Sequence, residues 1–133
     1  EVTGPITLTL FAATSAVDTD FTGKLVDVHP DGFARNLTDG ILRARYRESR
    51  TQGTLLKPGD VYEYTIDLWA TSNVFKAGHR IRLEIASSNF PRFDRNPQTG
   101  EQGGEATRLE PALQHIFHDA LRPSHVVLPI IPR

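Results

Sequence analysis

Apolar and polar residues alternate with a period of two along most of the chain. Ile6, Leu8 and Leu10 alternate with threonines, and residues 61–69 and 79–87 continue the alternation with charged residues at many of the polar positions. A period of two puts the apolar side chains of a strand on one face, which is typical of antiparallel sheets that pack one side on a core. The pattern predicts about eight strands, over residues 6–12, 24–29, 33–37, 41–47, 61–69, 79–87, 112–118 and 124–131.

Short segments rich in proline, aspartate and glycine separate these strands. Residues 29–32 combine a proline that presets φ, an aspartate that bonds locally and a glycine that accepts positive φ. Residues 38–40, 57–60 and 76–78 carry turn signals of the same kind. Short strands with turns at such intervals predict an all-β sandwich or barrel, and the length predicts a single domain over residues 1–133.

One long segment departs from this rhythm. Residues 89–111 contain three prolines and three glycines and show little apolar periodicity. A loop of about twenty residues is uncommon in a compact domain and is often functional. We expect a short helix within residues 105–114. The alternative is that the segment only wraps one end of the sandwich.

The first part of this segment has the composition of a docking surface, because aromatic and arginine side chains are common interface anchors. Trp69 falls on the solvent side of its strand, where it could be a sugar platform or be covered by a neighbouring domain. The internal alternative is that Phe90 and Phe93 plug the end of the sandwich and Asp94 pairs locally with an arginine. The candidate interface residues are Asn89, Phe90, Arg92, Phe93, Asp94, Arg95, Asn96 and Trp69.

Composition narrows the class of protein. The 15 Lys and Arg nearly balance the 16 Asp and Glu, for a net charge of -1, which excludes bulk electrostatic binding of nucleic acid or anionic lipid as the main function. No apolar run approaches the roughly 18 residues of a membrane span. The absence of cysteine excludes disulfides, a thiolate catalyst and Cys-ligated zinc, and it leaves the compartment open. Without any methionine, the chain is expected to be cut from something longer.

The motifs of common catalytic sites are missing from the sequence. No serine has the flanking glycines of the Gly-x-Ser-x-Gly elbow used by α/β-hydrolases. A Walker-type phosphate loop and a Gly-x-Gly-x-x-Gly fingerprint are absent as well. We therefore predict no catalytic residues and no cofactor in this chain, and no esterase or peptidase activity from this chain alone.

The histidines and clustered aspartates do not predict a metal site. His115 and His118 stand three positions apart in a predicted strand, so their side chains should point to opposite faces. His29 lies at the mouth of a turn and His79 starts a strand, and both are expected to be structural or solvated. The aspartates of residues 18–20 could suggest calcium, but capping of backbone N–H groups is the favoured interpretation.

Arginines allow two interpretations. Those of residues 43–47 and of residues 80–82 lie on the solvent side of two predicted strands. They could form an anion-binding stripe. They could instead pair across strands with Glu63, Asp67 and Glu84, and the balanced total charge favours this second interpretation.

Five longer segments, residues 18–32, 40–48, 78–83, 87–96 and 123–131, resemble a known family. They are similar to the C-terminal jelly-roll domain of the cocaine esterase and X-Pro dipeptidyl-peptidase family of serine hydrolases, and most of all to its cocaine esterase branch. The resemblance implies a galactose-binding-like jelly-roll β-sandwich. Because the family's domain begins earlier than this chain does, the sandwich could lack its first strands.

In that family an α/β-hydrolase domain carries the Ser-His-Asp triad, and the jelly roll sits behind it. The resemblance therefore implies a non-catalytic accessory domain of a bacterial ester or peptide hydrolase, with the bacterial cytoplasm as the favoured compartment. It would support the N-terminal catalytic domain of the same parent chain and help to shape the substrate site. No nucleic acid or membrane partner is expected.

Two further expectations accompany this interpretation. A missing opening strand would leave a sheet edge unpaired, so we expect a homodimer formed through an edge strand. The alternative function is a carbohydrate-binding jelly-roll module, which would need several exposed aromatic side chains on one face. The sequence offers only Trp69 as such an exposed aromatic side chain.

Overall fold

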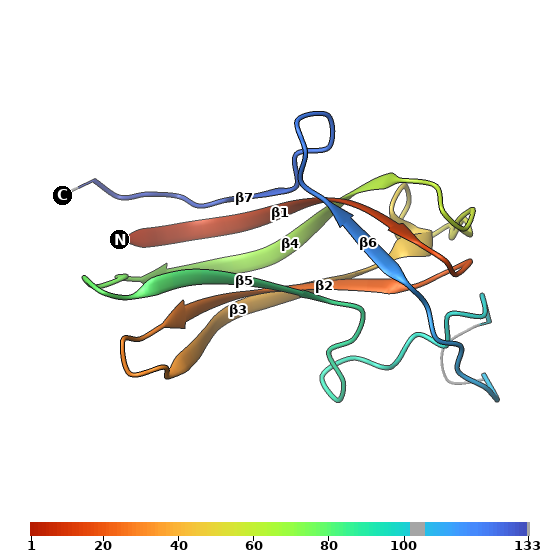
Figure 1. Cartoon of the computed structure of the whole chain (residues 1–133), viewed down its shortest axis with the longest axis horizontal. Coiled ribbons are helices and arrows are strands. Elements are labelled where there is room, and N and C mark those ends of the chain that lie inside the picture. Colours follow the sequence, from red (N-terminus) through yellow and green to blue (C-terminus); the bar gives the residue numbers. More distant parts are fainter. Residues whose placement is uncertain (102–105, 133) are drawn as a thin grey trace.

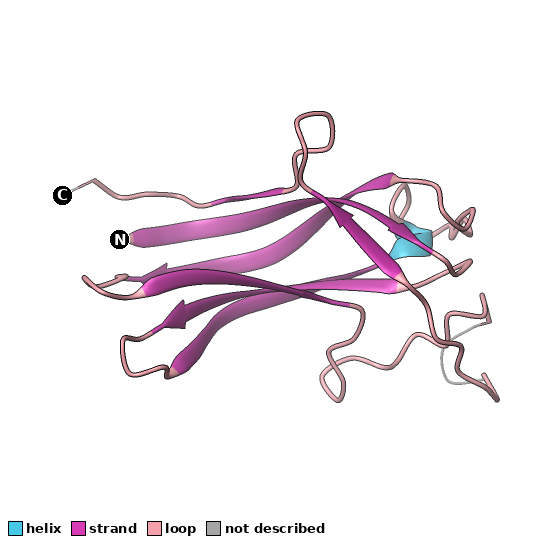
Figure 2. Cartoon of the chain, viewed as in Figure 1, coloured by secondary structure: helices cyan, strands magenta, loops and turns pink. Residues whose placement is uncertain are grey.

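A computed structural model describes residues 1–101 and 106–132, which form two antiparallel sheets packed face to face (Figures 1 and 2). The elements are β1 (Val2–Thr14), β2 (Asp20–Val28), β3 (Ala34–Arg43), the 3-10 helix η1 (Ala44–Tyr46), β4 (Tyr62–Asn73), β5 (Arg80–Ala86), β6 (Gln114–Phe117) and β7 (His125–Val127). The predicted all-β sandwich is confirmed. No helix in the described part of the chain is long and apolar enough to cross a membrane.

Each sheet is built around one central strand. In the first sheet β1 pairs with β4 on one side and with both β6 and β7 on the other. In the second sheet β2 lies between β3 and β5. Strand β5 therefore pairs with only one described strand and forms an edge of its sheet.

The predicted alternation positions the core. Burial of large apolar side chains contributes about 1.5–3 kcal/mol each and drives the two sheets together. Tyr64 of β4 packs on Phe21 of β2 across the sandwich, with ring centroids 4.8 Å apart. The buried cluster consists of Val2, Ile6, Leu8, Leu10, Ala12, Phe21, Leu25, Ala44, Leu56, Tyr64, Ile66 and Leu68.

Three of the predicted turns are confirmed. Gly32, Gly59 and Gly78 have φ values of 91°, 87° and 83°, which side chains with a Cβ rarely adopt. The backbone N–H of Gly32 donates to the carbonyl oxygen of His29, and that of His79 to the carbonyl oxygen of Lys76, which closes two of these turns.

The predicted turn at residues 38–40 is wrong, because this segment lies inside β3. A Cβ on Gly40 would lie 2.0 Å from the carbonyl oxygen of Asp67, and Thr38 Oγ1 donates to the carbonyl oxygen of Leu68. The glycine permits close approach of β3 to β4. Glycine serves this purpose in strands as well as serving turns, and the sequence signal is the same for both.

Other boundaries change as well. The two strands predicted over residues 33–37 and 41–47 are replaced by the single strand β3, which ends at Arg43, and by η1, which follows it. Seven strands are therefore present in the described residues, and β6 and β7 are shorter than predicted. Of the helix expected over residues 105–114, residue 105 lies outside the described residues, residues 106–113 are not helical, and β6 begins at the last position.

Candidate docking surface

The segment of residues 89–96 follows β5 and is attached at its start to strand β3. Asn89 Nδ2 donates to Asp39 Oδ2 at 2.8 Å, and Arg92 Nη1 lies 2.6 Å from Asp39 Oδ1. Asp39 itself is buried in β3. The N–H of Phe93 donates to the carbonyl oxygen of Asn89 at 3.2 Å. The first half of the segment is thus held by its own domain.

Asn96 fixes the end of the segment on a buried network of charges. Its Nδ2 donates to Asp18 Oδ2 and to Asp20 Oδ1, both at 2.9 Å. Asp18 also accepts the backbone N–H of Arg45 at 3.1 Å and its Nε–H at 2.8 Å. Arg43 holds Asp20 through Nε and Nη2 at 2.9 and 3.2 Å. The predicted capping of a backbone N–H by an aspartate of residues 18–20 is confirmed for Asp18.

Asp94 joins the same network from the loop. Its two carboxylate oxygens lie 3.0 and 3.1 Å from Nη2 of Arg43. The hydrogen bond from Arg43 to Asp20 raises the pKa of the Arg43 guanidinium above its usual range; partial burial opposes this, and Asp94 adds to the increase. Arg43 therefore stays charged and links two carboxylates, one of β2 and one of the loop.

The aromatic side chains of the segment behave differently from its polar ones. Phe90 is 58% exposed, and the guanidinium of Arg95 lies over its ring at 4.5 Å. Phe93 is half-buried, with the guanidinium of Arg92 at 5.6 Å from its ring centroid. Phe90 therefore does not plug the end of the sandwich. Arg95 forms no ion pair with any described residue.

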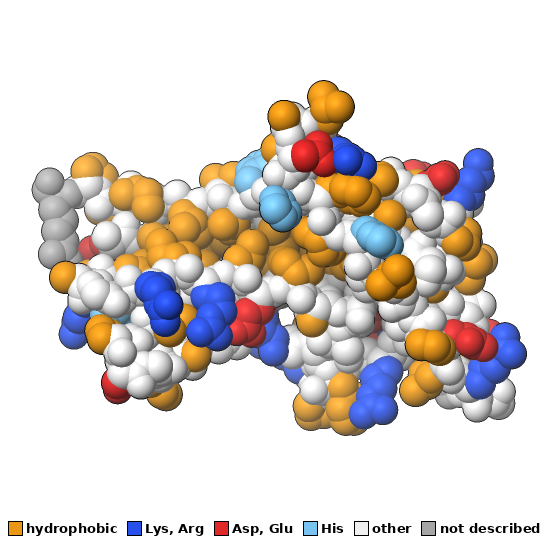
Figure 3. All heavy atoms as spheres, in the orientation of Figure 1, with side chains coloured by type: hydrophobic (Ala, Val, Ile, Leu, Met, Phe, Trp, Pro, Cys, Tyr) orange, Lys and Arg blue, Asp and Glu red, His pale blue; other side chains and the backbone are white. Residues whose placement is uncertain are grey.

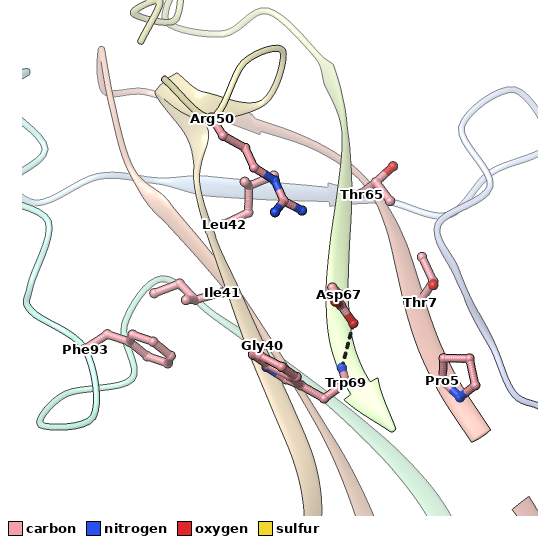
Figure 4. A pocket seen from close by; sticks show the side chains of 10 residues that line it. All are labelled: Pro5, Thr7, Gly40, Ile41, Leu42, Arg50, Thr65, Asp67, Trp69 and Phe93. Atoms are coloured by element: carbon pink, nitrogen blue, oxygen red, sulfur yellow. Dashed lines mark hydrogen bonds between the residues drawn. The ribbon is translucent and has the colours of Figure 1, made fainter. Parts of the chain in front are cut away.

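A groove of about 640 Å³ opens beside this segment, between β3 and β4 (Figure 4). Phe93 contributes to it from the loop and Trp69 from β4, and the side chain of Arg50 reaches into the space between the two strands. The groove is lined by Pro5, Thr7, Gly40, Ile41, Leu42, Arg50, Thr65, Asp67, Trp69 and Phe93. We call this groove the docking surface; Phe90 lies exposed on the same loop as Phe93.

Trp69 is presented to the groove by an irregularity in β4. The register of β1 against β4 slips between Pro5 and Thr7, and Trp69 there has a φ of 64°. Its backbone N–H donates to Asp67 Oδ1 at 2.7 Å, and the residue is 67% exposed. A bulge redirects a side chain, and positive φ is rare for a large residue and persists only where the surroundings hold it. The predicted solvent-side position of Trp69 is confirmed.

The structure brings the predicted site residues into two groups. Trp69 and Phe93 meet at one groove, and Phe90 and Arg95 lie exposed on the same loop. Asn89, Arg92, Asp94 and Asn96 bond instead to aspartates and an arginine of their own domain. The sequence did not indicate Arg50 as a groove residue, because its closeness to β4 appears only in the folded chain.

The arginines of residues 43–47 form no anion-binding stripe and none of the predicted pairs with Glu63, Asp67 and Glu84. Arg43 does pair across strands, but with Asp20, its register partner on β2. The strand ends at Arg43, so the 3-10 turn directs Arg45 inward to Asp18. Arg47 lies over the ring of Tyr62 at 4.4 Å. On β5, Arg82 pairs with Glu84 of the same strand and not with a neighbouring strand.

Comparison with known proteins identifies the family. A family model described as the X-Pro dipeptidyl-peptidase C-terminal non-catalytic domain matches residues 1–127. The chain belongs to this family. The resemblance found in the sequence is thereby confirmed, and the lack of a nucleophile elbow agrees with a non-catalytic domain of this kind.

Curated relatives of this family member are esterases. The cocaine esterase of Rhodococcus sp. (strain MB1 Bresler) is 52% identical over 135 residues, which cover 100% of this chain and 24% of that protein. A putative serine esterase of Mycobacterium tuberculosis is 36% identical over 110 residues, which cover 70% of this chain and 18% of that protein. The chain therefore spans about a quarter or less of the relatives it matches.

Solved structures agree with this fold. An aminopeptidase from a Thaumarchaeota archaeon superposes with a TM-score of 0.93 at 36% identity, over 98% of this chain and 23% of that chain. An α-amino acid ester hydrolase superposes with a TM-score of 0.89 at 29% identity, over 96% of this chain and 23% of that chain. In both cases the match is to a minor part of a longer hydrolase.

Proposed function

We propose that this chain is the C-terminal accessory domain of a larger serine hydrolase and that its docking surface packs on the parent's N-terminal catalytic domain. Membership of a non-catalytic C-terminal domain family supports the first part. The observation that carries the second is that one groove is lined by both the exposed Trp69 and Phe93. Burying such aromatic side chains in a partner's pockets supplies most of the binding energy of many interfaces.

The proposed role is to support the catalytic domain and to help shape its substrate site. Hydrogen bonds from Asn89 to Asp39 and from Asn96 to Asp20, which Arg43 also holds, fix the loop before docking. Little conformational entropy is therefore lost when the interface forms. The parent would hydrolyse an ester or an amide by acyl transfer to a serine of the catalytic domain and then to water. An oxyanion hole for that reaction would also lie outside this chain.

The decisive experiment removes the two aromatic anchors in the intact parent enzyme. Trp69→Ala combined with Phe93→Ala is expected to lower the thermal stability and the turnover of the parent. The isolated chain with the same changes should melt almost unchanged, because Trp69 contributes little to its core. Leu121→Ala is the matched control, since this apolar side chain is 89% exposed and lies outside the groove. Equal loss of stability in the isolated chain would contradict docking.

The isolated chain should lack hydrolase activity of its own. We propose this because the sequence has no nucleophile elbow, and all serines lie outside such a motif. Hydrolysis of an activated ester well above background, abolished by a serine-directed phosphonate, would overturn this part of the proposal. The carbohydrate-binding alternative would require saturable binding of oligosaccharides that Trp69→Ala removes.

The isolated chain is also proposed to form a homodimer through the edge strand β5. Figure 3 shows hydrophobic side chains gathered along the side of the molecule between β5 and β7. Ile81 of β5 is 52% exposed and Val127 of β7 is 55% exposed, and an unpaired edge recruits another strand. Light scattering should report a dimer that Ile81→Lys weakens. A monomer across a wide concentration range would contradict the dimer and leave the accessory role untouched.

The parent is proposed to act in the bacterial cytoplasm. The esterase relatives of Rhodococcus and Mycobacterium support a bacterial parent. Fractionation of cells that express the parent would test the compartment, and activity recovered outside the cytoplasmic fraction would contradict it.

A further inference from the structure

Asp27, near the end of β2, meets two histidines from distant parts of the chain. Its Oδ1 lies 2.8 Å from Nδ1 of His79, and its Oδ2 lies 3.8 Å from Nε2 of His29. The three ligand-capable atoms all lie within 4.8 Å of one another. Asp27 is buried, whereas the side chain of His29 is 31% exposed, so solvent reaches the cluster at His29.

Two turns and a central strand hold these side chains in place. Asp27 sits in β2, whose backbone pairs with β3 on one side and β5 on the other. His29 begins the β2–β3 turn, where its N–H donates to the carbonyl oxygen of Phe33 at 2.8 Å and its ring meets that of Phe33 edge-on. His79 ends the β4–β5 turn, where its N–H donates to the carbonyl oxygen of Lys76 at 3.0 Å. The arrangement is therefore preorganised.

Hydrogen bonding accounts for only one of the two imidazoles. At 2.8 Å, His79 and Asp27 form a hydrogen bond, but at 3.8 Å the ring nitrogen of His29 is too far for one. None of the described residues forms a hydrogen bond to the His29 ring. The two imidazole centroids nevertheless lie 4.3 Å apart beside one carboxylate. A ligand between the three groups would explain why both rings are gathered there.

The spacing suits a small divalent ion. Ligand atoms about 2.0–2.1 Å from a zinc ion lie roughly 3.4 Å apart when the coordination is tetrahedral. The observed separations of 2.8 and 3.8 Å, which run to the two different carboxylate oxygens of Asp27, lie on either side of that value. All three ligand atoms lie within 4.8 Å of one another, so modest side-chain shifts would bring them to this spacing. Asn73 Nδ2 donates to Asp27 Oδ2 at 3.4 Å and can help to orient the carboxylate, as outer partners of metal ligands do.

We propose that Asp27, His29 and His79 bind one divalent transition-metal ion. Zn²⁺ is the ion used to test the site. Two imidazoles and one carboxylate are a donor set that Zn²⁺ accepts, and the exposed side of His29 leaves the fourth position to water. The ion would join the β2–β3 turn to the β4–β5 turn at one end of the sandwich. Ca²⁺ and Mg²⁺ prefer oxygen ligands and should not bind here.

The proposal also predicts which proton changes position. As a ligand, His79 must present the lone pair of Nδ1, so its proton moves to Nε2 and the hydrogen bond to Asp27 is replaced by two bonds to the ion. The net charge of a neutral imidazole is unchanged by this exchange. Nitrogen NMR of the ring should therefore report a tautomer change at His79 when Zn²⁺ is added.

Zinc titration calorimetry on the chelator-treated chain at neutral pH tests the site. One ion per chain is expected to bind, with affinity in the micromolar range, and to raise the melting temperature. His29→Ala and His79→Ala should each weaken binding by about tenfold or more. His115→Ala is the matched control, because this exposed histidine of β6 lies outside the cluster.

Several outcomes would overturn the proposal. They are the absence of saturable binding to the native chain, binding by the His29 and His79 variants as tight as that of the native chain, and equal weakening by His115→Ala. If His79→Ala does not fold, as judged by its circular dichroism spectrum, the decision rests on His29→Ala and on the ring NMR of the native chain. In that case an unchanged His79 tautomer in saturating zinc also rejects the site.

Discussion

Strand β2 carries two buried carboxylates, one at each end, and their surroundings differ. Asp20, at its start, accepts hydrogen bonds from Nε and Nη2 of Arg43 and from Nδ2 of Asn96, all within 3.2 Å. Asp27 near its end receives one imidazole at 2.8 Å, a second at 3.8 Å and an amide at 3.4 Å. The same residue type on the same strand is thus saturated at one end and only partly satisfied at the other.

The difference lies in the chemistry of the partners. A guanidinium is always charged and has no lone pair to offer, so the Asp20 end can only anchor a loop. An imidazole can donate a proton or present a lone pair, so the Asp27 end can exchange a hydrogen bond for a metal ion. We therefore expect the Asp20 end to hold the loop permanently and the Asp27 end to exchange its hydrogen bond for the proposed metal ion.

The largest effect should come from breaking the network at the Asp20 end, in which Asn96 donates to both Asp20 and Asp18. Asp18→Ala removes the carboxylate that holds the Arg45 guanidinium, and the Arg45 side chain is only 9% exposed. An uncompensated buried charge costs about 3–5 kcal/mol, which urea denaturation should detect in the free energy of unfolding. Glu84→Ala, which breaks the exposed pair with Arg82, should cost only about 0.2–1 kcal/mol. Similar losses from both variants would contradict the distinction between anchoring and surface pairs.

A smaller effect is expected from Gly78→Val, next to the imidazole end. Gly78 has a φ of 83°, and a Cβ there would lie 3.3 Å from Cγ of Pro30. The change should cost about 1–3 kcal/mol, measured by thermal and urea denaturation. Gly78→Asn is the control, since asparagine tolerates positive φ better than valine. An unchanged melting temperature for the valine variant would show that this turn can adopt another conformation.

Tyr64 probes the core beside the saturated end, where it packs on Phe21. Burial raises the pKa of Tyr64 above its usual value of about 10. A raised pKa in the folded state means that stability is intact below about pH 10 and falls as the pH increases further, because the unfolded chain ionises first. Tyr64→Phe should remove this alkaline loss, as measured by denaturation across that pH range.

At neutral pH the same variant should change stability by less than about 1 kcal/mol, because Tyr64 Oη has no hydrogen-bond partner among the described residues. A large loss at neutral pH would indicate that the hydroxyl does have a partner. An alkaline loss that persists in Tyr64→Phe would assign it to other groups.

The smallest effect on the isolated chain should follow from Arg92→Ala combined with Arg95→Ala. The side chain of Arg92 is 57% exposed, and Asn89 still donates to the buried Asp39 after the change, so the loss should be smaller than that of Asp18→Ala. In the intact parent the same variant should lower thermal stability and turnover, if both arginines face the catalytic domain. Equal losses in both forms would show that they serve only this domain.

Local pattern determined much of this protein. The period of two correctly placed Leu8, Leu10 and Ile66 in the core, because the face of a strand depends only on the parity of the position. Gly32 and Gly78 were predictable as turn residues, since positive φ is a local property. Longer segments were sufficient to identify the family.

Only the tertiary structure decided which distant groups meet. Asp20 and Asn96 are 76 residues apart, and His79 and Asp27 are 52 apart, so their contacts depend on strand register and on the order of strands in the sheet. Gly40 looked like a turn because its signal is identical for a turn and for close approach of two sheets. The docking groove and the imidazole cluster arise in the same way. Composition singled out Trp69 and Phe93 as candidates, but only folding brings them to one groove and brings the two histidines to Asp27.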